Sequence, residues 1–360
     1  MIGHLAAIAN TGDGGSSNTV SAHIVTPLEG VQAGFAHVTY DDGYDLERAK
    51  ELARTAEAVL LVVGYTKADE GEFVSPDTTS GLRSLFPAPS TPAEAQIAAS
   101  VASGLAARAE ASGAFSRGGD RASLRLRPAD ELLIQAVASV NQNVIVAVMS
   151  GSAVLMNIWE DAVSAVALLW YPGMEGGHAL SDVLLGRVNP SGKLPFSIAK
   201  VDAHYPHFDR GATTVSYDLW HGYRKLESDG NAAAYPFGFG LSYTTYALSD
   251  LQLEQPPNRV TATLKVTNTG QNHGEEIVQL YVAALDSKVE RPVKELKAFA
   301  RVALQPSQTS TVTLNIPISS LEYFDEQLGD FTLEPTEYEF IVAQHSADAN
   351  ALRGKIRLSE

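Results

Sequence analysis

The hydrophobic pattern of this 360-residue chain changes its period near residue 250. Before that point, short apolar runs alternate with longer amphipathic stretches of helical period, whereas after it apolar and polar residues alternate with a period of two. Strands alternating with helices indicate a mostly parallel sheet covered on both faces, and a series of short alternating segments indicates an antiparallel sandwich. We therefore expect α/β followed by all-β in one chain.

The α/β part is expected over residues 1–200, as a three-layer α/β sandwich with a mostly parallel sheet. Strands are predicted at six apolar runs, 2–9, 36–40, 58–65, 143–150, 165–171 and 193–198. Helices are predicted at three amphipathic stretches, 45–58, 128–140 and 177–186. Asp45 and Pro128 suit helix starts and Gly186 suits a helix stop.

An insert rich in Ala, Ser and Pro interrupts this pattern at residues 75–119. A helix is predicted inside it over about 92–112, with Ile97, Val101 and Leu105 on one face. Long inserts of this kind are either functional lids or disordered segments. The apolar face favours a helix that packs onto another surface.

The all-β part is expected over residues 250–360, where alternating segments recur at about ten-residue spacing, as in a fibronectin type III-like or immunoglobulin-like β-sandwich. Residues 201–249 form an aromatic-rich connecting segment. Its aromatic side chains need apolar surface to bury, so we expect the segment to wrap across the α/β domain.

Composition excludes several classes of function. The formal charge of −16 and the absence of any basic run argue against nucleic acid as a partner. The chain has no cysteine, which removes disulfides, thiol nucleophiles and thiolate metal sites. His204 and His207 have a spacing found in metal sites but lack a third ligand motif, so no metal and no cofactor is predicted. No apolar run reaches membrane-spanning length and no signal peptide is evident, which predicts a cytoplasmic protein as the sequence is written, with no membrane partner.

Three carboxylates follow one predicted strand within four residues. In "LLVVGYTKADEGEF" the strand breaks at Gly64 and is followed by Asp69, Glu70 and Glu72. An acidic solvated loop is one reading of this pattern. The other is a proton donor or acceptor in a cleft, because ligands of open α/β sheets bind beyond the carboxyl ends of the strands.

Several stretches taken together resemble the carboxyl-terminal half of glycoside hydrolase family 3, the β-glucosidase family. They are "AVLLVVGYTKADEGEF", "NVIVAVMSGSAVLM", "ALLWYPGMEGGHALSDVLLGRVNPSGKLPFSI", "WHGYRKLE" and "YPFGFGLSYTTY", followed by the sandwich pattern. The resemblance covers essentially the whole chain apart from the insert, and it implies an α/β sandwich domain followed by a fibronectin type III-like domain. It further implies a retaining β-glycosidase that hydrolyses O-glycosidic bonds of a β-linked glucoside or related carbohydrate.

The resemblance also implies where the acid/base residue lies. Retaining glycosidases use two carboxyl groups about 5 Å apart, one as nucleophile and one as proton donor. In the family the proton donor comes from a loop with a pattern like E-G-x-D-R. Glu70 and Gly71 fit its first half, and Gly119, Asp120 and Arg121 resemble its second half displaced by the insert.

Glu70 is therefore the acid/base candidate, with Glu72 as the runner-up. Weaker signals mark Asp120, Arg121 and Glu175 as substrate-binding candidates, although pairing with each other or bracing of the loop suits Asp120 and Arg121 better. Glu175, in "WYPGMEGG", suits equally the cap of the helix that follows it.

In the family the nucleophile lies on a (β/α)8 barrel that precedes these domains, and we expect that barrel to lie outside residues 1–360. Two functions follow as alternatives: the acid/base-bearing part of a β-glucosidase, or a non-catalytic truncated module that binds sugar or a protein partner. An esterase built on Ser150 and Ser152 is a weaker alternative, because no G-x-S-x-G motif accompanies them. A barrel-bearing chain, or self-association through an exposed interface, is the expected partner.

Overall fold

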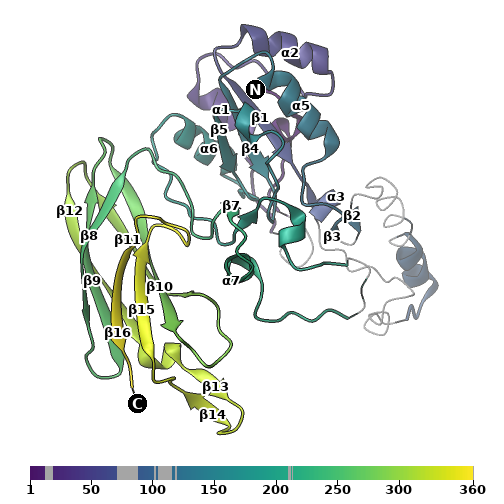
Figure 1. Ribbon diagram of the computed structural model, residues 1–360. Helices are drawn as coiled ribbons and strands as arrows, with labels where there is room; N and C mark the ends of the chain where they lie inside the picture. The colour runs from purple at the N-terminus through teal and green to yellow at the C-terminus, as the bar shows by residue number, and fades with distance from the viewer. Residues whose placement is uncertain are drawn as a thin grey trace. The chain divides into compact units, whose positions relative to one another are not determined.

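The computed structural model describes residues 1–12, 19–70, 88–100, 103, 116–117, 120–209, 212 and 214–359 (Figure 1). The chain divides into two compact units by its contacts. Unit 1 comprises Met1–Leu185 with Phe208–Thr213, and unit 2 comprises Gly186–His207 with Thr214–Glu360. Each unit is described by itself below.

The sheet of unit 1 contains three parallel strands in the order β1 (Val59–Gly64), β4 (Val144–Met149) and β5 (Ala165–Leu168). Ile2 makes parallel bridges to Leu61 of β1 and to Asp41, so two short extended segments continue the sheet beyond β1. All six residues of β1 are buried, as expected of a parallel strand covered on both faces. The predicted α/β class is confirmed.

Helices cover both faces of this sheet. On one face, α1 (Pro27–Gly34) and α6 (Gly176–Leu184) bury Val31 and Leu180 in a cluster with Leu60 and Val62 of β1. On the other face, α2 (Leu46–Thr55) packs with α5 (Pro128–Ala138), which also contacts β1 and β4 (Figure 1). Alternate side chains of β1 therefore pack against the helices on the two faces of the sheet.

The helix starts follow from local chemistry. Asp45 caps α2 by accepting hydrogen bonds from the backbone N–H groups of Glu47 and Arg48, and Pro128 occupies the first turn of α5, as predicted. Helix α1 was not predicted from the sequence. It begins with a capping box, in which Thr26 and Glu29 satisfy each other's backbone N–H groups.

Three predicted strands are wrong over most of their length. In residues 2–9 only Ile2 pairs, because Gly3 turns the chain at φ 116° and His4–Ala7 then form a 3₁₀ helix, η1. A side chain at Gly3 would clash with the Val62 carbonyl oxygen, so the turn requires glycine. Residues 36–40 form no strand, and within 193–198 only Ile198 joins the short strand β6 (Ile198–Ala199).

The insert is helical at residues 92–100. Ile97, predicted to face a packing surface, is 65% exposed. Val101 and Leu105 lie outside the described residues. Within the described residues, Ile97 therefore lies against no packing surface.

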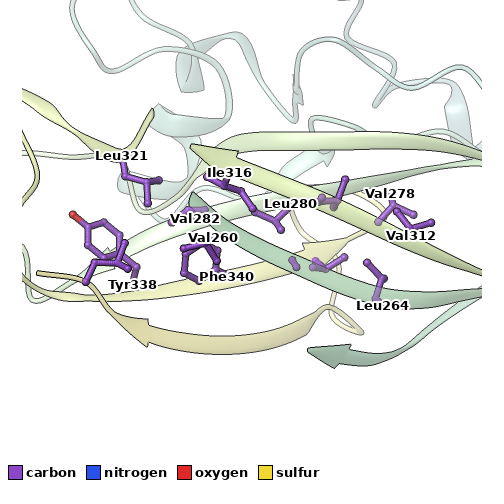
Figure 2. Close-up of a cluster of buried hydrophobic side chains, with 14 of the residues drawn as sticks. Val260, Leu264, Val278, Leu280, Val282, Val312, Ile316, Leu321, Tyr338 and Phe340 are labelled. Carbon is purple, nitrogen blue, oxygen red and sulfur yellow. The ribbon is translucent and has the colours of Figure 1, made fainter. Parts of the chain in front are cut away.

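Unit 2 contains the β-sandwich, which confirms the predicted change of class. One sheet has the order β11-β10-β15-β16 and the other β12-β9-β8. The strands are β8 (Tyr246–Glu254), β9 (Arg259–Asn268), β10 (Gly274–Leu285), β11 (Glu295–Leu304), β12 (Thr309–Pro317), β15 (Glu337–Ala343) and β16 (Leu352–Arg357). Buried residues alternate along β9 and β12, and their side chains meet those of β10 and β15 between the sheets (Figure 2).

One buried polar side chain joins the strand ends of this sandwich. Asn268 is fully buried and accepts hydrogen bonds from the Thr244 hydroxyl at 2.7 Å and the Gly270 N–H at 3.1 Å. Its amide donates to the carbonyl oxygens of Asn272 and Leu304. The amide oxygen and the amide nitrogen of Asn268 are thus both fully hydrogen-bonded, as buried polar groups usually are.

Unit 2 also contains smaller elements outside the two sheets. The aromatic-rich segment supplies β7 (Ala233–Tyr235), which pairs with β6, and the helix α7 (Gly222–Ser228), and the hairpin of β13 (Tyr323–Asp325) and β14 (Asp330–Thr332) lies between β12 and β15 in the sequence. Tyr223 and Phe237 of this segment stack at 4.9 Å and contact Tyr281 of β10. Tyr223 and Phe237 are thus half-buried against Tyr281 within unit 2, and the predicted wrapping across the α/β domain is not needed to explain their burial.

Candidate functional site

The candidate site lies at the carboxyl edge of the parallel sheet. Parallel strands end at the same edge, so the segments that follow them come together. Glu70 is the last residue of α3 (Lys67–Glu70), the helical turn after β1. Ser150 and Gly151 follow β4, and Tyr171 follows β5.

The Glu70 carboxylate joins all of these segments. Its side chain is 8% exposed and pairs with the Arg121 Nε at 3.0 Å. It also accepts hydrogen bonds from the Ser150 hydroxyl at 3.2 Å, the Gly151 N–H at 2.7 Å and the Tyr171 hydroxyl at 2.6 Å. Each of the two carboxylate oxygens therefore meets two donors, which hold the Glu70 side chain in place.

Arg121 is held as firmly as Glu70. It belongs to the short strand β3 (Asp120–Arg121), which pairs with β2 (Ser116–Arg117), and its side chain is 4% exposed. The guanidinium donates to the Ser152 hydroxyl and to the Ala153 carbonyl oxygen, and it lies 4.3 Å from the centre of the Tyr65 ring. Arg121 therefore ties β3 to the segments that follow β1 and β4, and the substrate-binding role suggested for it stays a prediction.

The two tyrosines of the site keep their protons. Burial, and after it the Glu70 carboxylate, raises the pKa of Tyr171 far above its ordinary value. Burial raises the pKa of Tyr65 to about 12, and its hydroxyl donates to the Arg125 carbonyl oxygen. Both hydroxyls thus serve as fixed donors at neutral pH. Trp170, next to Tyr171, has φ 55°, a strained backbone conformation for a bulky residue.

Two further carboxylates, Asp69 and Asp130, are buried close to this network. Asp69 is buried, accepts a hydrogen bond from the Thr66 N–H at 2.9 Å and pairs with Arg127. Asp130, in the first turn of α5, is also buried, and its Oδ2 has no partner among the described residues. Burial raises the pKa of Asp130 to about 6, although Arg127 acts to lower it.

Glu175 lies apart from this network. It occupies the N-cap position of α6, but its side chain makes no capping hydrogen bond. Its exposed carboxylate instead contacts His23 Nε2 at 2.6 Å and His178 Nδ1 at 2.7 Å. Both contacts lower the pKa of Glu175, and the contact with His178 has the larger effect. Glu175 thus lies at the start of the helix, as predicted, although its side chain makes no capping hydrogen bond, and its substrate-binding role stays a prediction.

Two of the predicted site residues cannot be placed in this way. Glu72 and the side chain of Asp120 lie outside the described residues. The sequence reasoning missed Tyr171 and Gly151 as partners of Glu70. The signal available for both was their position just after predicted strands of one parallel sheet.

The esterase alternative finds no support in the contacts of Ser150. Its single hydroxyl proton has two acceptors within reach, the Glu70 carboxylate at 3.2 Å and the Ser152 carbonyl oxygen at 2.9 Å, and no histidine contacts it among the described residues. Within the same part of the chain, no group of His, Asp and Glu side chains has the arrangement of a metal site. No helix in the described ranges is long and apolar enough to span a membrane.

Comparison with known proteins identifies the class that this fold and edge site define. Residues 1–243 match the model of the glycosyl hydrolase family 3 C-terminal domain, and residues 276–346 match that of the fibronectin type III-like domain. The protein is thus of the glycoside hydrolase class. It belongs to glycosyl hydrolase family 3, which confirms the resemblance seen in the sequence.

Relatives and solved structures agree with this assignment. A beta-glucosidase of Rhizobium radiobacter is 39% identical over 245 residues, which are 64% of this chain and 30% of that protein. The crystal structure of a Bifidobacterium adolescentis GH3 beta-glucosidase superposes with a TM-score of 0.77 at 27% identity, over 99% of this chain and 48% of that one. That of the beta-D-glucoside glucohydrolase from Trichoderma reesei superposes with a TM-score of 0.82 at 24% identity, over 99% of this chain and 51% of that one, which speaks for the fold. The chain thus spans about half the length of these solved structures.

Proposed function

We propose that this chain is the acid/base-bearing part of a retaining β-glucosidase. The observation that carries the proposal is the Glu70 network, which fixes the start of the loop after β1 at the carboxyl edge of the sheet. The beta-glucosidases that the chain resembles support β-linked glucosides as the substrate class. A nucleophile on a barrel would complete the pair of carboxyl groups that the retaining route needs.

Glu70 has two possible roles in such an enzyme. As the proton donor, it would have to exchange the donors around it for the leaving-group oxygen during the reaction. As an anchor, it would keep its present contacts and position the loop, and Glu72, two residues further along, would donate the proton. The four donors and the low exposure of Glu70 favour the anchor role.

The two roles predict different kinetics for variants of the complete enzyme, in which this chain acts together with a nucleophile-bearing barrel. Glu70→Gln and Glu72→Gln are compared on a β-glucoside with a poor leaving group and on one with a nitrophenolate leaving group. Loss of the proton donor slows the poor leaving group by about 10²–10⁴-fold. It spares the first step with the good leaving group, and azide, which needs no general base, restores turnover.

The anchor role predicts that Glu72→Gln shows this pattern. Glu70→Gln then loses activity on both substrates, gains nothing from azide and unfolds at lower temperature. The matched control is Glu51→Gln, an exposed glutamate on α2 that we expect to be neutral. Azide rescue of Glu70→Gln would assign the proton donor to Glu70 itself, and full activity of both variants on the poor leaving group would overturn the proposed function.

The non-catalytic module remains the second candidate. It would retain the fold and bind sugar or protein without turnover. Self-association of the chain, predicted from the sequence, is checked by sedimentation at micromolar concentration, where a clean monomer would contradict it.

A further inference from the structure

We infer that a pocket in unit 2 binds a neutral sugar. The pocket has a volume of about 330 Å³, at the lower end of the range for small-molecule sites. It is formed by an extended segment and one face of α7. Its lining residues are Pro206, Ser216, Tyr217, Asp218, Trp220, Lys225, Ser228 and Asp229.

The polar lining is held in place by its own contacts. Asp218 Oδ1 accepts a hydrogen bond from the Trp220 backbone N–H at 2.8 Å, and the Trp220 indole N–H donates to Glu290 at 3.0 Å. On α7, Lys225 and Asp229 are one turn apart on the same face and pair at 2.8 Å. The pocket is therefore organised before any ligand enters, which lowers the entropic cost of binding.

The lining still offers groups to a ligand. In the part of the chain that the structure describes, the second oxygens of Asp218 and Asp229 accept no hydrogen bond from the protein. Tyr217 is 72% exposed, although aromatic side chains usually bury most of their surface. An exposed ring beside the half-buried Trp220 provides apolar faces next to free acceptors.

The charges of the lining select the kind of ligand. A simple cation would meet the Lys225 ammonium, and a phosphate would meet two carboxylates on a chain of net charge −16. A hydroxyl group both donates and accepts, so it suits carboxylate and ammonium alike. A sugar ring carries several such hydroxyls at its edge and C–H groups on its faces, which can stack on Tyr217 or Trp220.

This proposal goes beyond the proposed function, because it needs neither the Glu70 network nor any turnover. A sugar site of this kind would let the chain hold a carbohydrate independently of catalysis. Its test is correspondingly one of binding.

The test is titration of the chain followed by NMR, with the Trp220 indole N–H as reporter. The chain has three tryptophans, and the absence of one resonance in Trp220→Phe identifies the reporter. We expect methyl β-D-glucoside and cellobiose to shift this resonance with Kd in the millimolar range, about −4 kcal/mol. Glucosamine and glucose 6-phosphate, at pH 6, are expected to bind at least about fivefold more weakly.

Variants locate the site. Tyr217→Ala and Asp218→Asn are each expected to weaken sugar binding, followed by the Trp220 resonance, at least about fivefold. Asp218→Asn keeps an acceptor for the Trp220 backbone N–H. Phe299→Ala, which removes an aromatic ring 68% exposed on β11, is the matched control and should bind as the parent does. Thermal unfolding of each variant checks that it folds.

Three outcomes would overturn the proposal. They are an unmoved Trp220 resonance with every sugar, tighter binding of either charged sugar, and unchanged binding by Tyr217→Ala. Each outcome leaves the proposed function intact, since none depends on the loop after β1.

Discussion

Arg121 is the residue whose loss we expect to destabilise unit 1 most. Arg121→Ala leaves the buried Glu70 carboxylate without its cation, and removal of one partner of a buried pair costs about 3–5 kcal/mol of unfolding free energy. Urea unfolding measures this. Arg54→Ala, which breaks an exposed pair with Glu51, is the matched control and should cost less than about 1 kcal/mol. Equal losses for the two variants would mean that the Glu70 network does not support the fold.

Asp130 should make the stability of unit 1 depend on pH. Its pKa of about 6 in the folded protein lies above the ordinary value of 3.8, so the folded state binds the proton more tightly than the unfolded state. The resulting stabilisation is complete below about pH 4 and is lost as the pH rises through about 6. Its full size is on the order of 3 kcal/mol.

The side chain in Asp130→Asn cannot titrate, so this variant should lack the loss of stability that Asp130 causes as the pH rises through about 6. We expect it to gain stability relative to the parent at pH 7 and little at pH 4, as measured by urea unfolding at both values. Asp161→Asn, which changes an exposed carboxylate, is the control. A parallel pH dependence of Asp130→Asn and the parent would contradict the assignment.

The sequence identified the residues of the site more readily than the contacts that those residues make. Glu70 and Arg121 were both marked by the resemblance, but the contact between them joins positions on either side of the insert. The donors from Ser150, Gly151 and Tyr171 lie 80 to 101 positions away in the sequence. Only the common edge of the parallel strands brings them to Glu70, and local pattern does not reveal which side chain turns toward which.

At the scale of elements, the end of β1 depends on Gly64. Its φ is 128°, and a Cβ there would lie 2.0 Å from the Met149 carbonyl oxygen of the neighbouring strand. Gly64→Ala should therefore cost at least about 2 kcal/mol through strain and overpacking. Gly12→Ala, with no atom of the described residues within 4 Å of the added carbon, is the control in the same unit and should change stability by less than about 1 kcal/mol. Circular dichroism during urea unfolding measures both, and a neutral Gly64→Ala would show that β1 and β4 separate readily at this end.

The central strands were predictable because burial on both faces gives long apolar runs. The run at 2–9 was misread for a related reason: Leu5 and Ala6 are fully buried in a 3₁₀ helix, and burial alone does not distinguish a helix from a strand. In the sandwich, alternation along β9 and β12 gave the period directly. The α7 helix escaped prediction, since its seven residues make just under two turns of pattern.

For the whole molecule, the two units should unfold in two transitions, because each has its own core. Arg121→Ala should lower the transition of unit 1. Asn268→Ala, which leaves several buried groups in the sandwich without partners, should lower that of unit 2 by about 2 kcal/mol or more. Differential scanning calorimetry of the parent and both variants tests this, and a single transition shifted alike by either variant would show one cooperative body.

Activity of the 360-residue chain by itself should be weak. One carboxyl group cannot complete the two-step retaining route, and the family resemblance assigns the nucleophile to a barrel. Assays of the purified chain with aryl β-glucosides, with and without an added barrel-bearing chain, measure this. Robust turnover by the chain alone, abolished in Glu70→Ala, would mean that a second carboxylate such as Asp69 or Asp120 acts as nucleophile.

The ion pair between Glu70 and Arg121 also has a consequence for how this protein can vary. The two residues bound residues 71–120, so one buried contact closes a loop of fifty positions at its base. The entropy of closing a flexible loop grows only with the logarithm of its length, about 0.6 kcal/mol for each doubling. With its base fixed in this way, the segment between them can lengthen, shorten or change composition at little cost to the sheet. Natural or engineered variation should accordingly accumulate between these two positions, except at Glu72, the proposed proton donor, while both side chains at the base stay constant.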